Sequence, residues 1–368
     1  MNQRVLVVEF GDSHHEIFPT HFRILDRAGY ETYAFVNARI ADRIPHGFQQ
    51  ETIVFEDRES PLRTAGRILS FCRKRGIRKV VLNSANGNAV RTFALAALAW
   101  PGLEVVGINH YVRKFRRSVS QKFISRKVRR YFVLSDIFFE NGSLRPDEGG
   151  LTIRSLYPVF FPEAGEEAAE EPGQVLLAVP GTVRQERRDY LGLLDLLAAK
   201  RSLVPDHVRF LILGDASSPD GRRFRSEIQR VGLDGFFRTF EGHVDNEIYY
   251  RLLRRADLML PLLHVEGGRY REFLDHKVSG SYALGMGFRI PFLMHRAFEG
   301  YSDFRDVSFF YDREDFVETL ARAVADPRAV AAKREAYGRN PKLSLEAQTK
   351  TYLEILDPRR SRCPVSGR

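Results

Sequence analysis

Residues 208–261 read VRFLILGDASSPDGRRFRSEIQRVGLDGFFRTFEGHVDNEIYYRLLRRADLMLP, and this stretch decides the fold class. Short apolar runs alternate in it with longer segments in which apolar residues recur at helical spacing. The apolar runs are 208–213, 237–240 and 258–261, and the helical segments are 224–231 and 247–255. Such alternation is typical of βαβ units around a parallel sheet. The stretch therefore predicts an α/β, Rossmann-like domain.

The same alternation continues on both sides of this stretch. The second half of the chain adds expected strands at 175–179 and 291–294 and helices at 190–199, 278–286 and 316–324. The first half predicts a separate series, with strands at 4–10, 32–36, 79–83, 104–108 and 131–134 and helices at 18–28, 61–75 and 88–100. Ligands of open α/β sheets bind beyond the carboxyl ends of the strands, so candidate site residues follow each strand.

A change of composition separates the two series. Residues 162–173 read PEAGEEAAEEPG, which is acidic, flanked by Pro and Gly and without periodic apolar content. At 368 residues the chain also exceeds what one hydrophobic core usually supports. The expected organisation is an N-terminal domain, an acidic linker, a C-terminal domain and a C-terminal helix with a basic tail. Their ranges are 1–162, 163–173, 174–340 and 341–368.

The bulk composition excludes several classes of protein. No run approaches the ~20 apolar residues that span a bilayer. The first apolar run is short and is followed by an acid and histidines, unlike a signal peptide. Cys72 and Cys363 lie far apart and near no histidine cluster with metal spacing. We therefore expect a cytoplasmic protein without a metal site.

The formal net charge of +10 predicts an anionic partner. Residues 113–130 concentrate this charge, because nine of them are Lys or Arg, none is acidic, and apolar residues interleave at roughly helical spacing. The segment predicts an amphipathic basic helix or pair of helices. A solvated helical face explains it as well as peripheral contact with the anionic inner face of a membrane, where each basic group contributes about 1 kcal/mol. No nucleic-acid-binding motif accompanies the charge, so we expect no specific nucleic acid.

Several stretches of residues 175–327 carry a family resemblance. They are AVPGTVRQERRDY, FLILGDASS, VGLDGFFRTFEGHVDNEIYYRLLRRADLMLPLLHVEGG, GSYALGMGFRIPFL and FVETLARAVADP. In this order and spacing they resemble the donor-binding domain of GT-B glycosyltransferases, particularly the retaining family 4. The resemblance implies two Rossmann-like domains facing each other across a cleft. It also implies a nucleoside-diphosphate sugar as donor, no tightly bound cofactor and no metal.

The first loop of this half is the expected contact for the diphosphate. A nucleotide sugar brings negative charge, and its leaving group develops more, so the site needs cations and oriented N–H groups. Gly181 follows the first strand, and the resemblance makes Arg184 the best match for the family's loop cation, with Arg188 second. The alternative is a set of exposed charges at the start of the next helix, where cations oppose the helix dipole.

The paired-glutamate motif of the family is only half present. Glu266 corresponds to its first glutamate, expected beside the sugar in a catalytic role, or else to a loop acid paired with a neighbouring Arg. The second glutamate is absent, because Leu274 stands eight residues further on.

A Lys-x-Ser-Gly-Ser sequence opens the next helix instead. Its Lys277, Ser279, Gly280 and Ser281 predict an anion site, since glycine admits a ligand to the backbone and the other side chains donate hydrogen bonds. An ordinary serine N-cap is the alternative. Gly214, Asp215 and His243 end strands where the resemblance implies nucleotide contacts, and for them a turn-forming role is equally plausible.

The N-terminal half offers a polar cluster after its first strand. Asp12, Ser13 and His15 are candidate acceptor contacts, and His14 is a candidate general base. Structural roles and metal binding are the alternatives, although adjacent histidines rarely share one ion. His110 resembles the strand-end histidine that family members place beside the sugar, and imidazole suits proton transfer near neutral pH. Its alternative is a histidine that only closes the strand.

These observations together predict a glycosyltransferase. It would move a sugar from a nucleoside-diphosphate donor to a glycan, a lipid-linked sugar or a small molecule, with retention and without a metal if the family's chemistry applies. Two alternatives remain: a nucleotide-sugar epimerase or hydrolase of the same fold, and a non-catalytic protein that binds a polyanion or a membrane.

Overall fold

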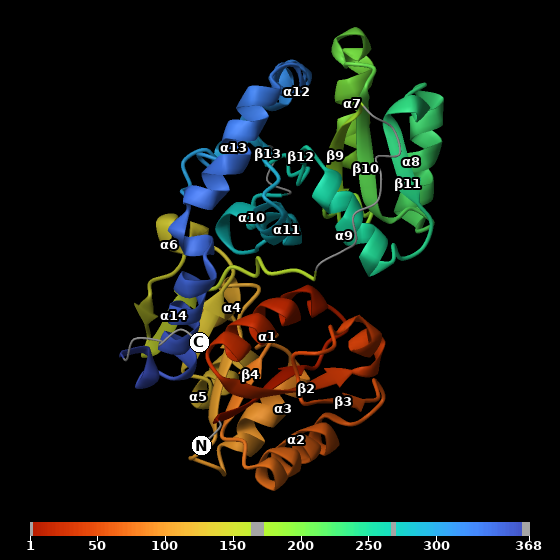
Figure 1. The fold of residues 1–368 in the computed structure, drawn as a ribbon. Helices are drawn as coiled ribbons and strands as arrows, with labels where there is room; N and C mark the ends of the chain where they lie inside the picture. The colour runs from red at the N-terminus through yellow and green to blue at the C-terminus, as the bar shows by residue number, and fades with distance from the viewer. Residues whose placement is uncertain (1–2, 163–172, 266–269, 363–368) are drawn as a thin grey trace. The chain divides into compact units, whose positions relative to one another are not determined.

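The computed structural model describes residues 3–162, 173–265 and 270–362 (Figure 1). The chain divides into two compact units. The first contains residues 1–162 together with 341–368, and the second contains residues 163–340. The C-terminal segment that we expected to stand apart therefore belongs to the first unit.

The first unit is built on an eight-stranded sheet with the order β3-β2-β1-β4-β5-β6-β8-β7. All neighbouring pairs are parallel except β7 and β8, which form an antiparallel pair. The strands are β1 (Gln3–Glu9), β2 (Tyr30–Asn37), β3 (Glu51–Phe55), β4 (Lys79–Leu82), β5 (Glu104–Ile108), β6 (Arg130–Val133), β7 (Asp147–Glu148) and β8 (Leu151–Ser155). The long helices are α1 (Phe18–Arg27), α2 (Pro61–Arg75), α3 (Asn88–Ala97), α5 (Val119–Lys127) and α14 (Leu345–Leu356), with short α4 (Arg113–Arg117) and α6 (Ile137–Glu140).

Helix α14 returns to the first unit because its apolar face completes that core. Tyr352 and Leu353 are fully buried among residues of α1 and β1. A polar contact also holds α14 against the first unit, since the Gln348 side chain accepts a hydrogen bond from the Tyr157 backbone N–H at 2.9 Å. Burial of this kind is what ties a chain terminus to a domain.

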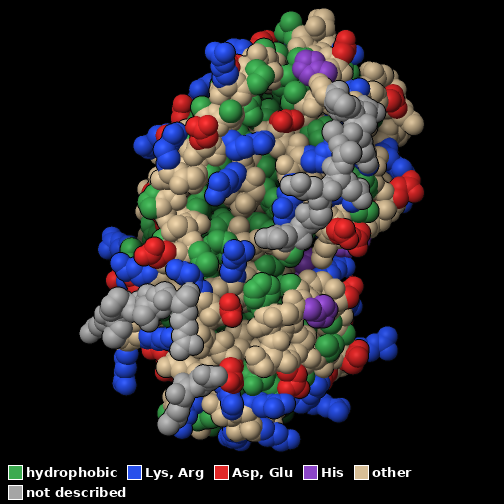
Figure 2. Space-filling view, in the orientation of Figure 1, with side chains coloured by type: hydrophobic (Ala, Val, Ile, Leu, Met, Phe, Trp, Pro, Cys, Tyr) green, Lys and Arg blue, Asp and Glu red, His purple; other side chains and the backbone are tan. Residues whose placement is uncertain are grey.

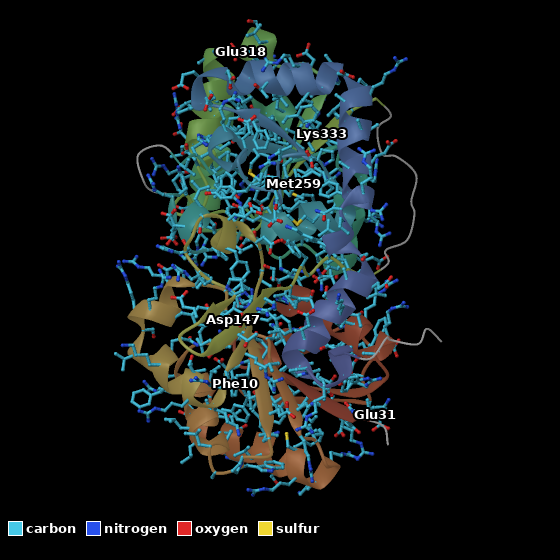
Figure 3. The ribbon with its side chains drawn as sticks, turned by 90° about the vertical axis from the view of Figure 1, so that its left-hand side faces the viewer. Phe10, Glu31, Asp147, Met259, Glu318 and Lys333 are labelled. Atoms are coloured by element: carbon cyan, nitrogen blue, oxygen red, sulfur yellow. The ribbon has the colours of Figure 1, made fainter. Side chains whose placement is uncertain are left out.

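The second unit has a six-stranded parallel sheet with the order β11-β10-β9-β12-β13-β14. The strands are β9 (Val175–Pro180), β10 (Val208–Asp215), β11 (Phe237–Phe240), β12 (Leu258–Met259), β13 (Phe292–His295) and β14 (Ser308–Tyr311). The helices are α7 (Tyr190–Ala199), α8 (Pro219–Arg230), α9 (Asn246–Arg255), α10 (Glu272–Asp275), α11 (Gly280–Phe288), α12 (Phe316–Ala325) and α13 (Pro327–Arg339). Met259, labelled in Figure 3, lies fully buried in the central strand β12.

Both sheets therefore contain the doubly-wound strand order 3-2-1-4-5-6. In such a sheet the direction in which successive strands are added reverses between strands 1 and 4, which are β1 and β4 in the first unit and β9 and β12 in the second. The crevice at this reversal is where α/β proteins bind ligands. The α/β, two-domain prediction is confirmed, and the loops after these strands are the places to look for a site.

Four strands were absent from the prediction, namely the hairpin strands β7 and β8 and the edge strands β3 and β14. Strand β3 reads ETIVF and has one fully buried residue, so it lacks the continuous apolar run of a central strand. Strand β14 reads SFFY at the other unit's edge, where its two Phe side chains are half-buried. Edge strands bury less surface, and their sequences carry a weaker signal.

Candidate functional site

Two glycines of the second unit allow its first loop to approach the sheet closely. Gly181, directly after β9, has φ +105°, a conformation that L side chains rarely adopt. A Cβ on Gly181 would lie 2.9 Å from the Arg188 guanidinium, and a Cβ on Gly214 would lie 2.1 Å from the Gly181 carbonyl oxygen. These positions therefore have to be glycine for Arg188 to occupy its place.

Arg188 is a buried cation without an opposite charge among the residues that the structure describes. Its side chain is 8% exposed, and Nη2 donates a hydrogen bond to Ser281 Oγ at 3.1 Å. Its Nε has no hydrogen-bond partner, and no carboxylate among the described residues pairs with it. A buried charge left in this state is costly, and an anionic ligand would remove the cost.

Two phenols lie within reach of the Arg188 charge. The hydroxyls of Tyr190 and Tyr282 are buried and have no hydrogen-bond partner among the described residues. Burial raises the pKa of both phenols, an effect that the nearby positive charge of Arg188 opposes. Unsatisfied buried donors of this kind are uncommon in native structures and call for a reason. Together with Arg188 they form a set of donors that an anion's oxygens would satisfy.

The amino end of α11 contributes to the same place. Ser279 caps the helix by accepting from the Ser281 N–H at 3.4 Å, and its hydroxyl donates to Ser281 Oγ at 3.1 Å. A Cβ on Gly280 would meet no atom within 4 Å, so the helix start is open to a ligand. Helix amino ends favour anions. Gly181, Arg188, Ser279, Gly280 and Ser281 are thus gathered at one place, which we call the Arg188 site.

The other predicted donor contacts are less closely involved. Arg184 is exposed and pairs with Glu186 at 3.5 Å, so the inward-facing cation is Arg188. Lys277 Nζ pairs with Glu272 Oε1 at 2.5 Å. Asp215 accepts hydrogen bonds from the Gly242 and Ser217 N–H groups, which makes it a turn residue.

Hydrogen bonding, mainly from Ser217, lowers the pKa of Asp215. His243 is exposed, and Glu266 lies outside the described residues.

A buried network that the sequence did not reveal supports the Arg188 loop. Asp189 caps α7, accepts a hydrogen bond from His264 Nδ1 at 2.7 Å and pairs with Arg313 at 2.9 Å. Burial would raise the pKa of Asp189, but the hydrogen bonds from His264 and Arg313 hold it well below its usual range. The N-cap position was readable from the sequence. His264 and Arg313 were not, because they come from distant loops.

In the first unit, His14 and His110 lie against each other. His14 has φ 65°, and the two rings stack with centroids 3.8 Å apart and 13° between their planes. His110 Nε2 donates to the Asn83 carbonyl at 2.8 Å, so the neutral ring carries its proton on Nε2 and leaves Nδ1 as an acceptor. Burial and the nearby charge of His14 lower the pKa of His110 to about 3. At neutral pH this imidazole can accept a hydrogen bond from a hydroxyl at Nδ1, and its one proton is engaged in the Nε2 hydrogen bond to the Asn83 carbonyl.

Glu16 connects to the histidine pair. Its carboxylate lies 3.4 Å from His14 Nδ1 and 4.0 Å from His15 Nδ1. Burial would raise the pKa of Glu16, but the hydrogen bond and positive charge of His14 outweigh it and lower the pKa to about 2. Asp12 is exposed and pairs with Arg39 at 3.4 Å, and Ser13 is exposed. His14 and His110 are therefore brought together, with His15 beside them, whereas Asp12 and Ser13 point to solvent.

Replacing Glu16 by Gln should remove a pH-dependent part of the stability. Because the folded-state pKa is lowered, this contribution is fully present above the ordinary value of about 4.5 and is lost as the pH falls toward 2. We expect the loss of melting temperature in E16Q to be larger at pH 6 than at pH 3. The exposed Glu56→Gln is the matched control. An equal loss at both pH values would show that Glu16 does not act through its charge.

A second polar network underlies the first-unit site. Glu9 is fully buried and accepts hydrogen bonds from the Gly11 N–H, Asn83 Nδ2 and Ser84 Oγ at 2.7, 2.8 and 2.6 Å. Asn83 Nδ2 also donates to the His14 carbonyl at 2.9 Å, and its Oδ1 accepts from buried His21. The carboxylate thus fixes the loops that carry both stacked histidines. A glutamate ending an apolar strand run was the available signal, and the prediction did not use it.

The described ranges contain neither a metal-binding cluster nor a membrane-spanning helix. No three His, Cys, Asp or Glu side chains within 3–162, 173–265 and 270–362 are grouped so that they could hold a metal ion. Over those same ranges, every helix is too short or too polar to cross a bilayer.

Several solved structures share this fold. A glycosyltransferase from Rickettsia africae is 14% identical, with a TM-score of 0.67, over 97% of this chain and 98% of that one. HepE of Anabaena, in complex with UDP, is 11% identical with a TM-score of 0.65 over 97% and 100%. A putative UDP-N-acetylglucosamine 2-epimerase from Listeria monocytogenes is 11% identical with a TM-score of 0.62 over 96% of each chain. No protein-family model and no curated protein matches the sequence. The similarity shows a GT-B type fold.

Proposed function

We propose that the protein is a glycosyltransferase that uses a nucleoside-diphosphate sugar. The observation that carries this proposal is Arg188, a buried cation with no carboxylate partner among the described residues, beside the open amino end of α11. A diphosphate supplies the missing negative charge and accepts hydrogen bonds from Arg188 and the α11 backbone. The UDP bound in HepE, a protein of the same fold, supports a uridine nucleotide as the first candidate.

The chemistry requires stabilisation of the leaving group. As the bond between the sugar and the diphosphate breaks, negative charge grows on the phosphate oxygens, and a cation already held in a water-poor site stabilises it without reorganisation. Arg188 and the hydroxyls of Tyr190 and Tyr282 are donors held in such a place. We propose that the backbone N–H groups of Ser279–Gly280–Ser281 donate further hydrogen bonds to the same diphosphate. Arg184 and Lys277 remain candidate outer contacts, with Gly214, Asp215 and His243 near the base.

The first unit would bind the acceptor. His110 Nδ1 is an acceptor for a sugar hydroxyl, and stacked His14 with its Glu16 partner is the candidate group for proton transfer. Because the pKa of His110 is about 3, we assign His110 to hydroxyl binding instead of proton transfer. Glu266, if the family resemblance holds, acts on the sugar of the donor. Retention and independence from metal follow from that resemblance.

A thermal-shift panel of UDP, GDP, ADP and dTDP tests the donor proposal. Ligand at a hundred times its dissociation constant stabilises the folded state by about 2.7 kcal/mol, which corresponds to a rise of roughly 5–11 °C in melting temperature for a domain of about 150–250 residues. At least one diphosphate should produce this shift, and its monophosphate should produce less. A flat panel would contradict the proposal and favour a non-catalytic protein.

An epimerase is the second candidate, because one structure of the same fold is a putative UDP-N-acetylglucosamine 2-epimerase. The two candidates differ in their products. A transferase releases free diphosphate only when an acceptor is present or, slowly, by hydrolysis, whereas an epimerase changes the sugar of a nucleotide sugar incubated alone. NMR of such an incubation distinguishes them.

A further inference from the structure

A pocket in the first unit is lined by residues that the transferase proposal does not use. It is a cavity of about 250 Å³ between α4, α5 and the β7–β8 hairpin. Asp147, labelled in Figure 3, marks β7 at this edge of the sheet. The floor is apolar and includes Phe115, Leu144 and Leu151, and the rim includes Arg116, Lys122, Arg126 and Arg129. An apolar floor with a cationic rim suits a ligand that is anionic at one end.

The charge of this pocket is only partly neutralised. Its one acid, Glu148, pairs with Arg116 at 2.8 Å, and that hydrogen bond lowers the pKa of Glu148. Lys122, Arg126 and Arg129 have no carboxylate partner among the described residues. Three positive charges therefore converge on the cavity without an internal anion. A phosphate group would complement them.

The helix that forms the rim also exposes apolar surface. Val119, Lys122, Phe123 and Arg126 are spaced i, i+3, i+4 and i+7 and so share one face of α5. Val119 is 67% exposed, and the Arg126 guanidinium lies over the Phe123 ring at 4.7 Å. The opposite face is anchored in the core by buried Ile124. Apolar residues set among cations on an exposed helix face are typical of binding to an anionic membrane surface.

We propose that this pocket binds the phosphate headgroup of an anionic membrane lipid. The cavity is smaller than the ~300–1,000 Å³ of sites that enclose drug-sized ligands, so a headgroup enters it while the acyl chains stay in the bilayer. Val119 and Phe123 face the same membrane surface. This inference goes beyond the transferase proposal and stands whether or not the second unit binds a nucleotide.

Cosedimentation with vesicles tests the proposal on the full chain. The protein should bind vesicles of phosphatidylcholine mixed with phosphatidylglycerol and should not bind phosphatidylcholine alone. The pocket pair Lys122→Gln with Arg126→Gln should weaken binding about thirtyfold, since each basic group near an anionic surface contributes about a factor of five to six. The variant should keep its melting temperature and any response to UDP. A failure of the lipid-binding proposal is therefore distinguishable from a failure of the donor-site proposal.

The matched control is Arg113→Gln with Arg117→Gln, two exposed cations of α4 that also have no carboxylate partner among the described residues and do not line the pocket. We expect this pair to weaken binding clearly less than the pocket pair does. Equal losses of vesicle binding in the two double variants would contradict binding in the pocket and would indicate a diffuse basic surface instead. Stabilisation of the protein by millimolar glycerol phosphate together with no binding to the anionic vesicles would overturn the lipid assignment in favour of a soluble phosphate ligand.

Discussion

Replacing Arg188 by Met should strongly weaken binding of nucleoside diphosphates and at the same time stabilise the ligand-free protein. In the free protein the guanidinium is buried, bonded only through Nη2 to Ser281 Oγ, and without a carboxylate among the described residues. Exchanging a buried charge for an apolar side chain of similar length is neutral or stabilising by about 1–4 kcal/mol. Removing one partner of a buried charge pair in the complex costs about 2–5 kcal/mol, a 30- to 5,000-fold loss of affinity.

Isothermal titration with UDP and a melting curve without ligand measure the two effects on one sample. Arg184→Met is the control, because Arg184 lies in the same loop but is exposed and paired with Glu186. It should change the melting temperature little and the affinity by at most about tenfold. A large drop in melting temperature for R188M would show that Arg188 is structural. Unchanged affinity would remove the central support for the proposed function.

The sequence predicted most of the strands and helices because their apolar patterns are local. The expected strands at 104–108 and 237–240 agree with β5 and β11 residue for residue, as does the helix at 61–75 with α2. The split of the basic segment into two helices at Ser118 was also within the prediction, which allowed a single helix or a pair. The return of α14 was not predictable from pattern alone. Its partners, such as Tyr157 for Gln348, lie 191 residues away.

The sequence predicted which loops carry the candidate site, but not which side chains of those loops point into it. The sequence marked Gly181 and several arginines after it, yet spacing alone does not tell which arginine turns inward. The Arg187 and Arg188 N–H groups both bond to the Arg184 carbonyl, and this turn places Arg188 under Gly181. Glu9 was overlooked for a related reason. A carboxylate in an apolar strand looks unfavourable until three donors from two loops are seen to satisfy it.

The net charge is another case in which the sequence predicted a feature but not the residues that carry it. Lys and Arg side chains are scattered over the face drawn in Figure 2 and alternate with acids there. Composition predicted an anionic partner without saying which cations would meet it. Burial and pairing make that distinction. Arg130 is neutralised by Glu104 at 2.6 Å, whereas Lys122, Arg126 and Arg129 at the pocket rim, and buried Arg188, have no carboxylate partner among the described residues.

Gly214→Ala should be the most damaging small substitution in the second unit. Its new methyl group would lie 2.1 Å from the Gly181 carbonyl oxygen, a backbone atom that cannot yield as a side chain can. Relief requires the Gly181 loop to move, and that loop carries Arg188. Overpacking of this kind costs about 1–3 kcal/mol and occasionally more. We expect a melting temperature lower by several degrees and loss of the thermal shift by UDP.

Two further glycine substitutions separate the effects of stability and binding. Gly280→Ala adds a methyl group where no atom lies within 4 Å, so the fold should tolerate it, but the methyl group would occupy the space that we assign to the diphosphate. Its expected signature is an unchanged melting temperature with weakened UDP binding. Gly338→Ala, on the exposed face of α13, should keep UDP binding and stabilise the helix by about 0.5–1 kcal/mol. If G280A bound UDP as tightly as G338A, the diphosphate would not sit at the amino end of α11, and the donor site would have to be sought elsewhere in the unit.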